Sequence, residues 1–565
     1  MQEEKIAQER VLTYPRFVWQ KIGGFFAAHM ISAMGALLFL LYAIFVLWPI
    51  FAMMVRSVTG TEGLTLQYYR EFFSHSYYYR ALTNSLLLGL VVTPVNITIA
   101  FCIAYMTTRG PIYLRKPLRL IVLLPLIAPP FIFALSLIIL FGRSGIITQA
   151  FNLNWSIYGF WGCAFAQTLS FLPLSYMMIE STLSSLDPNL EDSAANLGAT
   201  EGKILRSITI PLLTPGFFKA ILLCFVMTVS AFGNLVILMG RTPFLAPDVY
   251  LMITGQYNFN MASVLSFFLI VPCAVIFIAQ NYLIKGRGYT TILGKPVAAE
   301  PRHITPAILI PMLAVSCVAC GFILLAFGVV GVGSFLNVVG VDNTFTLKHI
   351  LDPGSTIALI SSIRISVLAG LFGGVVGVLL AYTITRGKFK GRATLEVMSL
   401  SGFAIPGAVF GIGYILAFNK PPLLLTGTMI ILVIVSGFRH LVIGEEAGIT
   451  KLQQLSIEIE EASQNLGAST LTTFRRIVLP IIFPAFMYGF MYVLMRTMIG
   501  LAAVIFLVSP GYPLAAIYIF DAATWGKMGL ASATTLKVVI AEAVCLAIIQ
   551  YLSKWTGLSV TRKRV

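Results

Sequence analysis

LDPNLEDSAANLGATEGKILRSITIPLLTP, residues 186–215, returns later in the chain as LSIEIEEASQNLGASTLTTFRRIVLPIIFP, residues 455–484. The two stretches align at a constant offset of 269 residues without a gap, and ten of their thirty positions are identical. An acid, a glycine and a proline match in both copies: Glu191 and Glu460, Gly198 and Gly467, Pro211 and Pro480. A repeat at one fixed offset indicates two copies of one structural unit in a single chain.

The repeat extends in both directions from these stretches. APPFIFALSLIILF (128–141) aligns with IPGAVFGIGYILAF (405–418) at an offset of 277, and VYLMITGQY (249–257) aligns with IYIFDAATW (517–525) at an offset of 268. The change from 277 to 269 falls in a predicted outer loop, where length changes are tolerated. The two units therefore run in the same direction and have the same topology.

Composition sets the environment of these units. The 565 residues are 58% hydrophobic and 11% charged, with a mean hydropathy of +0.90, whereas ordinary soluble domains carry about 25% charge. This excludes a water-soluble enzyme, a disordered chain and a disulfide scaffold. We predict an all-α membrane protein of about twelve spans in two parallel six-helix halves, residues 1–290 and 305–565, joined by a linker at 291–304. The predicted spans are 30–55, 81–107, 119–141, 157–183, 208–239, 262–284, 305–331, 357–385, 395–418, 427–449, 478–508 and 531–553.

The net charge of 38 − 22 = +16 has its source in the loops. Basic residues gather in both tails, in the linker, after the second span from Arg109 to Arg119, and at 386–392. The positive-inside rule then places both termini and the linker of this multi-pass membrane protein in the cytoplasm. We expect contact with the lipid bilayer and no binding of nucleic acid.

The repeated stretches fall in cytoplasmic loops between the fourth and fifth spans of each half. Asp187 followed by Pro188 is typical of a helix start, and the acids at 191, 192, 460 and 461 lie where a helix dipole favours them. Gly198 and Gly467 can end the first helix in a turn. A single helix–Gly–helix could equally be a plain connector, but two copies favour a contact surface that transmits force.

These residues resemble a known motif. EDSAANLGA with IPLLTP, and EEASQNLGA with LPIIFP, are similar to the EAA loops in permease subunits of bacterial ABC importers, and the resemblance covers both halves of the chain. It implies the MetI-like fold, two copies of a separate cytoplasmic ATPase that binds ATP and Mg, and a periplasmic or lipid-anchored substrate-binding protein. It also implies that the loops dock on the ATPases through these residues: Glu191, Asp192, Ala195, Gly198, Glu460, Glu461, Ala462 and Gly467. None of the four Gly-Lys pairs completes GxxxxGK[ST], so we expect no ATP hydrolysis and no cofactor in this chain.

Other stretches resemble the fused permeases for ferric iron, including residues 158–188, 245–263, 287–296, 404–428 and 502–510. Fused permeases for 2-aminoethylphosphonate, thiamine, polyamines or hexose phosphates share the same architecture, so the substrate stays open, and ferric iron is the leading hypothesis. An ion-coupled secondary transporter is the alternative class. It would need a carboxylate relay in the membrane and gives no reason for two polar loops.

A few residues inside the spans are candidates for the translocation path. Pro129, Pro130 and Pro406 each leave a carbonyl unpaired, which is tolerated against protein or a water-lined cavity; a packing kink is the alternative. Arg439 and His440 lie in the tenth span with Glu446 on the same face, where either a substrate contact or an internal ion pair is possible. Glu180, Arg364, Glu396 and Arg496 are expected to reach the interface. No ligand cluster for a metal is evident, and a metal site stays unknown.

The matched segments 249–257 and 517–525 are expected on the periplasmic side. Two interpretations stay open: these segments anchor the spans through their aromatic residues, or they receive the two lobes of a binding protein. In the second case Asp248 and Asp521 would be exposed contact residues.

Overall fold

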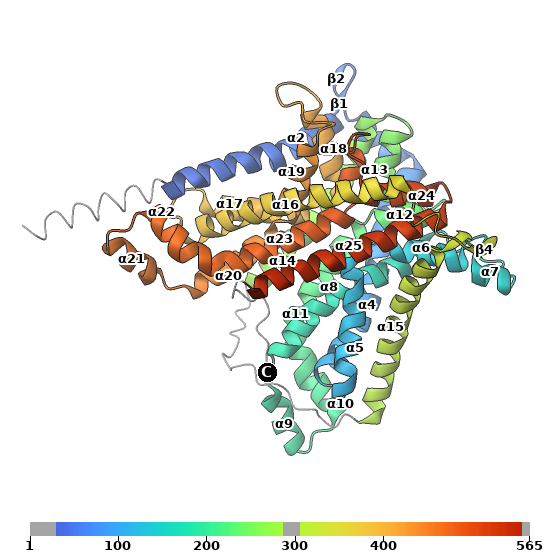
Figure 1. The fold of residues 1–565 in the computed structure, drawn as a ribbon, viewed down its shortest axis with the longest axis horizontal. Coiled ribbons are helices and arrows are strands. Elements are labelled where there is room, and N and C mark those ends of the chain that lie inside the picture. Colours follow the sequence, from blue (N-terminus) through green and yellow to red (C-terminus); the bar gives the residue numbers. More distant parts are fainter. Residues whose placement is uncertain (1–29, 286–304, 556–565) are drawn as a thin grey trace, which may run out of the picture.

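The computed structural model describes residues 30–285 and 305–555, and most of this part is helical (Figure 1). The predicted linker at 291–304 and both basic tails lie outside the described residues. Ten described helices are long and apolar enough to cross a membrane, and a bent pair would make eleven. The all-α prediction is confirmed, and five of the twelve predicted spans, the third, fifth, ninth, tenth and eleventh, are interrupted.

The elements of the first half follow one another from the first span to the sixth. The first span is Met30–Ser57, with η1 (Ala43–Leu47) and α2 (Trp48–Ser57) inside it. It is followed by β1 (Thr59–Gly60), β2 (Gly63–Leu64), α3 (Gln67–Ser74), α4 (Ser76–Thr108), α5 (Ile112–Leu123), η2 (Leu124–Ile127), α6 (Ile132–Phe141), α7 (Ile146–Ala150), α8 (Phe160–Ser185), α9 (Pro188–Asn196), α10 (Glu201–Ile204), η3 (Leu205–Thr209), α11 (Ile210–Val229), α12 (Gly233–Leu238), α13 (Leu245–Thr254) and α14 (Phe259–Lys285).

The second half repeats this order. It comprises α15 (Pro306–Gly333), β3 (Leu336–Val338), β4 (Asp342–Phe345), α16 (Pro353–Arg386), α17 (Arg392–Ala404), α18 (Gly407–Phe418), α19 (Met429–His440), α20 (Val442–Gln454), α21 (Ile457–Asn465), α22 (Thr470–Thr473), η4 (Phe474–Val478), α23 (Leu479–Ile499), η5 (Val504–Phe506), α24 (Ala515–Thr524) and α25 (Met528–Trp555). In each half an antiparallel hairpin, β1–β2 or β3–β4, follows the first span.

Proline accounts for two of the broken spans. The third is interrupted at 128–131, which includes Pro129 and Pro130, between η2 and α6. The ninth bends by 108° between α17 and α18, where Pro406 is the N-cap of α18. Proline lacks the amide donor that a continuous helix needs and fixes its own φ, which favours a break at these two places, although other helices such as α4 and α8 continue through a proline. The tenth span divides into α19 and α20 at Leu441.

The halves interlock through their first spans. The helices α4, α8 and α11 pack on one another in the first half, as do α16, α20 and α23 in the second. The first span of each half lies against the other half instead: α2 packs on α18, and α15 packs on α4 and α6. In Figure 1 the blue first span accordingly runs beside α18 and α19, and α15 lies beside α4 and α5. The Tyr414 hydroxyl of α18 donates to the Phe45 carbonyl at 2.6 Å, which ties the two halves together.

Glycines allow the closest helix contacts in the second half. A Cβ at Gly374 of α16 would lie 2.9 Å from the Phe486 ring of α23, and one at Gly444 of α20 would lie 2.7 Å from Cα of Gly489. The glycines at 370–377 serve close packing, because their missing side chains let α23 and α20 approach α16.

Candidate functional site

The repeated loops project from one side of the molecule as two short helices, α9 and α21 (Figure 1). Asp187 caps α9 by accepting from the Asn189 amide at 3.0 Å, and Ser456 caps α21 by accepting from the Glu458 amide at 3.3 Å. Gly198 and Gly467 follow the ends of these helices with φ of +83° and +89°. Only glycine adopts such angles without strain, so the predicted helix start and turn are confirmed.

The matched acids fasten these helices to the membrane bundle. Glu191 is buried and accepts from Nε of Arg109, at the end of α4, at 3.0 Å; Thr209 donates to its other oxygen at 2.8 Å. Glu460 accepts from Nε of Arg386, the last residue of α16, at 2.7 Å. Each loop is therefore held to the same span of its own half by a buried, charge-assisted bond, the stronger class of hydrogen bond.

In the sequence alone, Arg109 and Arg386 count only as part of the positive charge of the loops and are not paired with the two acids. They are separated by 277 residues, the offset of the aligned segments in the third and ninth spans, and this match was the signal that could have paired them with the two acids. The copies differ in detail: Arg386 also donates to the carbonyls of Leu452 and Leu455 at 3.1 and 2.9 Å. In the first copy, Nη2 of Arg109 is buried without a partner.

The other predicted loop residues face away from the bundle. Asp192, Ala195, Glu461 and Ala462 are exposed. Leu197 and Leu466, which directly precede the turn glycines, are 89% and 90% exposed. Exposed leucines at matching tips are typical of a surface that another protein covers. The loops thus divide into a buried acid that anchors and an outer face that is free to make contact.

A second candidate site is a cavity of about 90 Å³ between the two halves. It contains Pro130 and Arg439 from the predicted path residues, together with Gln167, Asn234 and Arg496. Pro129 is buried beside Pro130. Pro406 does not line the cavity but starts α18 next to it, because a Cβ at Gly407 would lie 2.6 Å from both terminal nitrogens of Arg439. The structure therefore brings these predicted residues to one place.

The cavity is built from matching positions of the two halves. Its lining includes pairs that are each 269 residues apart: Phe171 and His440, Met227 and Arg496, Ser230 and Ile499, Ala231 and Gly500, Phe232 and Leu501, Gly233 and Ala502. Most of them lie where α11 and α23 have just ended, although we predicted uninterrupted spans over 208–239 and 478–508. Non-helical backbone at this depth is tolerated where it lines a cavity, and that explains the difference.

Two further expectations about charged residues are wrong. Arg439 forms no ion pair with Glu446 or any other described residue, and Glu446 is exposed. Arg496 lines the cavity instead of reaching the interface. Glu180 does lie at a helix end, paired with Arg119 at 3.4 Å. Among the described residues there is no group of three or more His, Cys, Asp or Glu that could hold a metal ion.

The chain matches the family described as "Binding-protein-dependent transport system inner membrane component" twice, over residues 96–288 and 373–558. The chain belongs to this family. It is thus an inner membrane component of a binding-protein-dependent transport system, a transporter subunit and not an enzyme, and the secondary-transporter alternative is excluded. Each match covers one copy of the loop and its flanking spans.

Individual members of the transport family match most of the chain. The ferric transport system permease protein FbpB of Actinobacillus pleuropneumoniae is 31% identical over 91% of this chain and 77% of its own length. A putative ferric transport system permease protein, FbpB 1 of Haemophilus influenzae, is 32% identical over 83% and 77%. A putative 2-aminoethylphosphonate transport system permease protein of Salmonella choleraesuis is 27% identical, over 38% of this chain and 82% of its own length.

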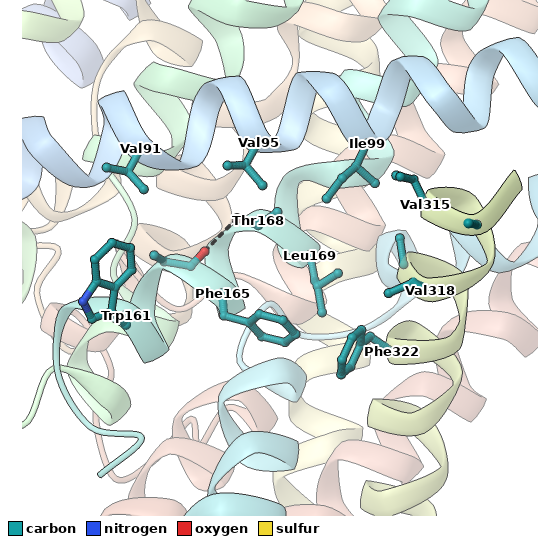
Figure 2. A pocket seen from close by; sticks show the side chains of 13 residues that line it. Val91, Val95, Ile99, Trp161, Phe165, Thr168, Leu169, Val315, Val318 and Phe322 are labelled. Carbon is teal, nitrogen blue, oxygen red and sulfur yellow. Dashed lines mark hydrogen bonds between the residues drawn. The ribbon is translucent and has the colours of Figure 1, made fainter. Parts of the chain in front are cut away.

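A further hollow of about 730 Å³ lies between α4, α8 and α15, and its lining is apolar (Figure 2). Side chains such as Val95, Phe165 and Phe322 point into it. Thr168 is its only hydroxyl, and that group donates to the Ala164 carbonyl at 2.8 Å. The lining can hold hydrocarbon and offers nothing to a charged cargo, so the small polar cavity is the better candidate for the path.

The matched segments 249–257 and 517–525, on the side opposite the repeated loops, correct one expectation about docking to a binding protein. Asp248 is fully buried in α13 and accepts from the Tyr77 hydroxyl at 3.0 Å, so it is no surface contact; Asp521 is exposed. Burial raises the pKa of Asp248 to about 7. The second half has the same bond with the roles exchanged, since Tyr518 of α24 donates to Asp352 at the start of α16 at 2.8 Å.

Proposed function

We propose that the chain is the permease of an ATP-driven importer and that two copies of a cytoplasmic ATPase dock on α9 and α21. The observation that carries this proposal is the pair of loops, each anchored by a buried Arg–Glu bond and each ending in an exposed leucine. ATP and Mg would be bound by the ATPases. The exposed residues Asp192, Ala195, Glu461 and Ala462 would form the contact, beside Gly198 and Gly467.

The anchors suggest how a movement of the ATPases reaches the path. A displacement of α9 would pass through Glu191 and Arg109 to α4, and through Thr209 to the start of α11. A displacement of α21 would pass through Glu460 and Arg386 to α16. Since the polar cavity lies between the halves, opposed movements of the two bundles would open it to one side of the membrane at a time. Pro129, Pro130, Pro406 and Arg439 would then belong to the translocation path.

The proposed arrangement in the membrane follows the distribution of charge. Residues 1–290 and 305–565 form two permease halves, the linker 291–304 and both termini are cytoplasmic, and the loops face the ATPases. A periplasmic or lipid-anchored binding protein delivers the substrate to the opposite face, where α13, α24 and the two hairpins lie (Figure 1).

Ferric iron is the substrate best supported. Two relatives named for ferric transport match most of this chain at 31–32% identity, whereas the phosphonate relative matches only 38% of it. The test uses the chain copurified with its ATPase and reconstituted with its iron-loaded binding protein. We expect one chain per two ATPase subunits and ATP-dependent uptake of radioactive iron. Two chains per ATPase pair would refute the fused-halves proposal, and uptake of 2-aminoethylphosphonate without iron uptake would refute the substrate.

A further inference from the structure

The polar cavity holds positive charge that nothing on its wall neutralises. Arg439 and Arg496 both line it, so two arginines of like charge share one small cavity. Neither forms an ion pair with a described residue. Charged side chains at membrane depth are costly and are normally paired or functional, so this arrangement needs a compensating negative charge.

The remaining polar groups of the cavity wall also suit a negatively charged ligand. Gln167 is buried with both its amide atoms unpartnered. Asn234 contributes a second amide, whose nitrogen also donates to the Ser170 hydroxyl at 2.7 Å and whose oxygen has no partner. The N-terminus of α18, a twelve-residue helix that begins at Gly407, adjoins the Arg439 guanidinium. Helix N-termini carry partial positive charge. Amide, guanidinium and helix N-terminus are all donors that suit an anion.

Acidic groups near the cavity do not cancel this charge. No Asp or Glu lines the wall. Glu542 of α25 interacts electrostatically with Arg496, but neither of its oxygens accepts a hydrogen bond. The carboxylate of Glu542 interacts with Arg496 only, so the positive charge of Arg439 is left uncompensated. His440 cannot replace the missing anion, since its Nδ1 lies 3.0 Å from the Ser436 carbonyl and the ring carries no negative charge in any state.

We propose that this cavity is an oxyanion site, and that the ferric ion passes it as a complex with a small oxyanion. The inference rests on the proposed function for the iron, but the site itself does not. A bare trivalent cation would be repelled by the two arginines, and the described residues offer it no ligand cluster. A cavity of about 90 Å³ has room for several waters or one small tetrahedral oxyanion, because one water needs roughly 10–15 Å³ of such space.

The test follows iron and anion together in the reconstituted importer. Radioactive iron and radioactive inorganic phosphate are supplied with the binding protein, and equilibrium binding of phosphate to the iron-free complex is measured separately. We expect phosphate to enter with iron in a fixed ratio and to bind without iron. Arg439→Gln should lower both binding and co-uptake at least tenfold, whereas Arg439→Lys should keep part of each. Arg364→Gln, which changes an exposed arginine of α16 outside the cavity, is the matched control and should behave as wild type.

Each result decides between the inference and the proposed function. If iron enters at the same rate without any oxyanion, its passage as an oxyanion complex is refuted. If folded Arg439→Gln binds and transports like wild type, the oxyanion site is refuted. The importer stands in both cases. If 2-aminoethylphosphonate enters alone and competes with phosphate for binding, the oxyanion site stands and ferric iron as the substrate is refuted. Arg496→Gln, judged by the same readings, keeps the test valid if Arg439→Gln fails to fold.

Discussion

Removal of Arg386 should uncouple the second loop from the bundle. Its guanidinium makes three bonds, to Glu460 and to the carbonyls of Leu452 and Leu455, and its side chain is 10% exposed against 7% for Glu460. Removing one partner of a buried pair costs about 3–5 kcal/mol, mainly because the other charge is left unpaired. Since about 1.4 kcal/mol is a factor of ten, Arg386→Ala should shift α21 strongly towards undocked states.

The assay compares ATP hydrolysis with uptake in proteoliposomes that contain the chain, its ATPases and the loaded binding protein. We expect Arg386→Ala to lower the hydrolysis stimulated by binding protein at least tenfold and to abolish most uptake. Arg392→Ala, which changes an exposed cation at the start of α17, is the matched control. The combination Arg386→Met with Glu460→Met should recover much of the coupling, because well-packed apolar residues can replace a buried ion pair without loss.

The two copies also predict a graded result. Among the described residues the side chain of Arg109 donates a hydrogen bond only to Glu191, and its Nη2 has no partner. Arg109→Lys should therefore lose only the geometry of this one bond. Arg386→Lys loses two carbonyl bonds as well, and hydrogen bonds to charged groups contribute about 1.5–3 kcal/mol each. Arg386→Lys should therefore impair coupling more than Arg109→Lys. Equal effects, or wild-type coupling in both alanine variants, would show that the anchors do not transmit the movement.

Three further predictions concern the loop tips and the opposite face. Gly467→Ala should lower the stability of the folded loop by about 1–2 kcal/mol through its positive φ alone, since a Cβ there meets nothing within 4 Å. It should also lower the uptake per ATP hydrolysed, and Gly467→Asn should lower it less. Leu466→Glu together with Leu197→Glu should release the ATPases from the purified complex, measured by subunit ratio, while the fold keeps its melting temperature. Burial raises the pKa of Asp248 to about 7. Between about pH 4 and pH 7 the folded state therefore holds a proton that the unfolded chain has released. The free energy of unfolding should fall as pH rises through this range and then level off. Asp248→Asn should remove that slope in thermal unfolding of the complex in nanodiscs.

The sequence predicted features whose causes are local. The capped start at Asp187, the turn at Gly198 and the unpaired carbonyl at Pro406 depend on a few neighbouring residues, so the sequence alone indicates them, although it did not predict that the ninth span breaks there. The anchors could not be read in this way, because Glu191 and Arg109 are 82 positions apart and Glu460 and Arg386 are 74 apart. Hydropathy likewise gave an uninterrupted span through Phe232 and Leu501, since apolar residues line the break as readily as they continue a helix.

The cavity shows where the two halves have diverged. The repeat places position 227 opposite position 496, and position 171 opposite 440, yet the first half carries Met227 and Phe171 where the second carries Arg496 and His440. Over the same chain the loops retain acid, glycine and proline in both copies. Two ATPase contacts of one kind, as proposed, would constrain both loops alike, whereas a cargo that binds between the halves would need its charge from only one of them. An oxyanion held by the second half and packed against Gln167 and Asn234 of the first would be gripped when the halves approach and released when they separate, which is what an alternating path requires.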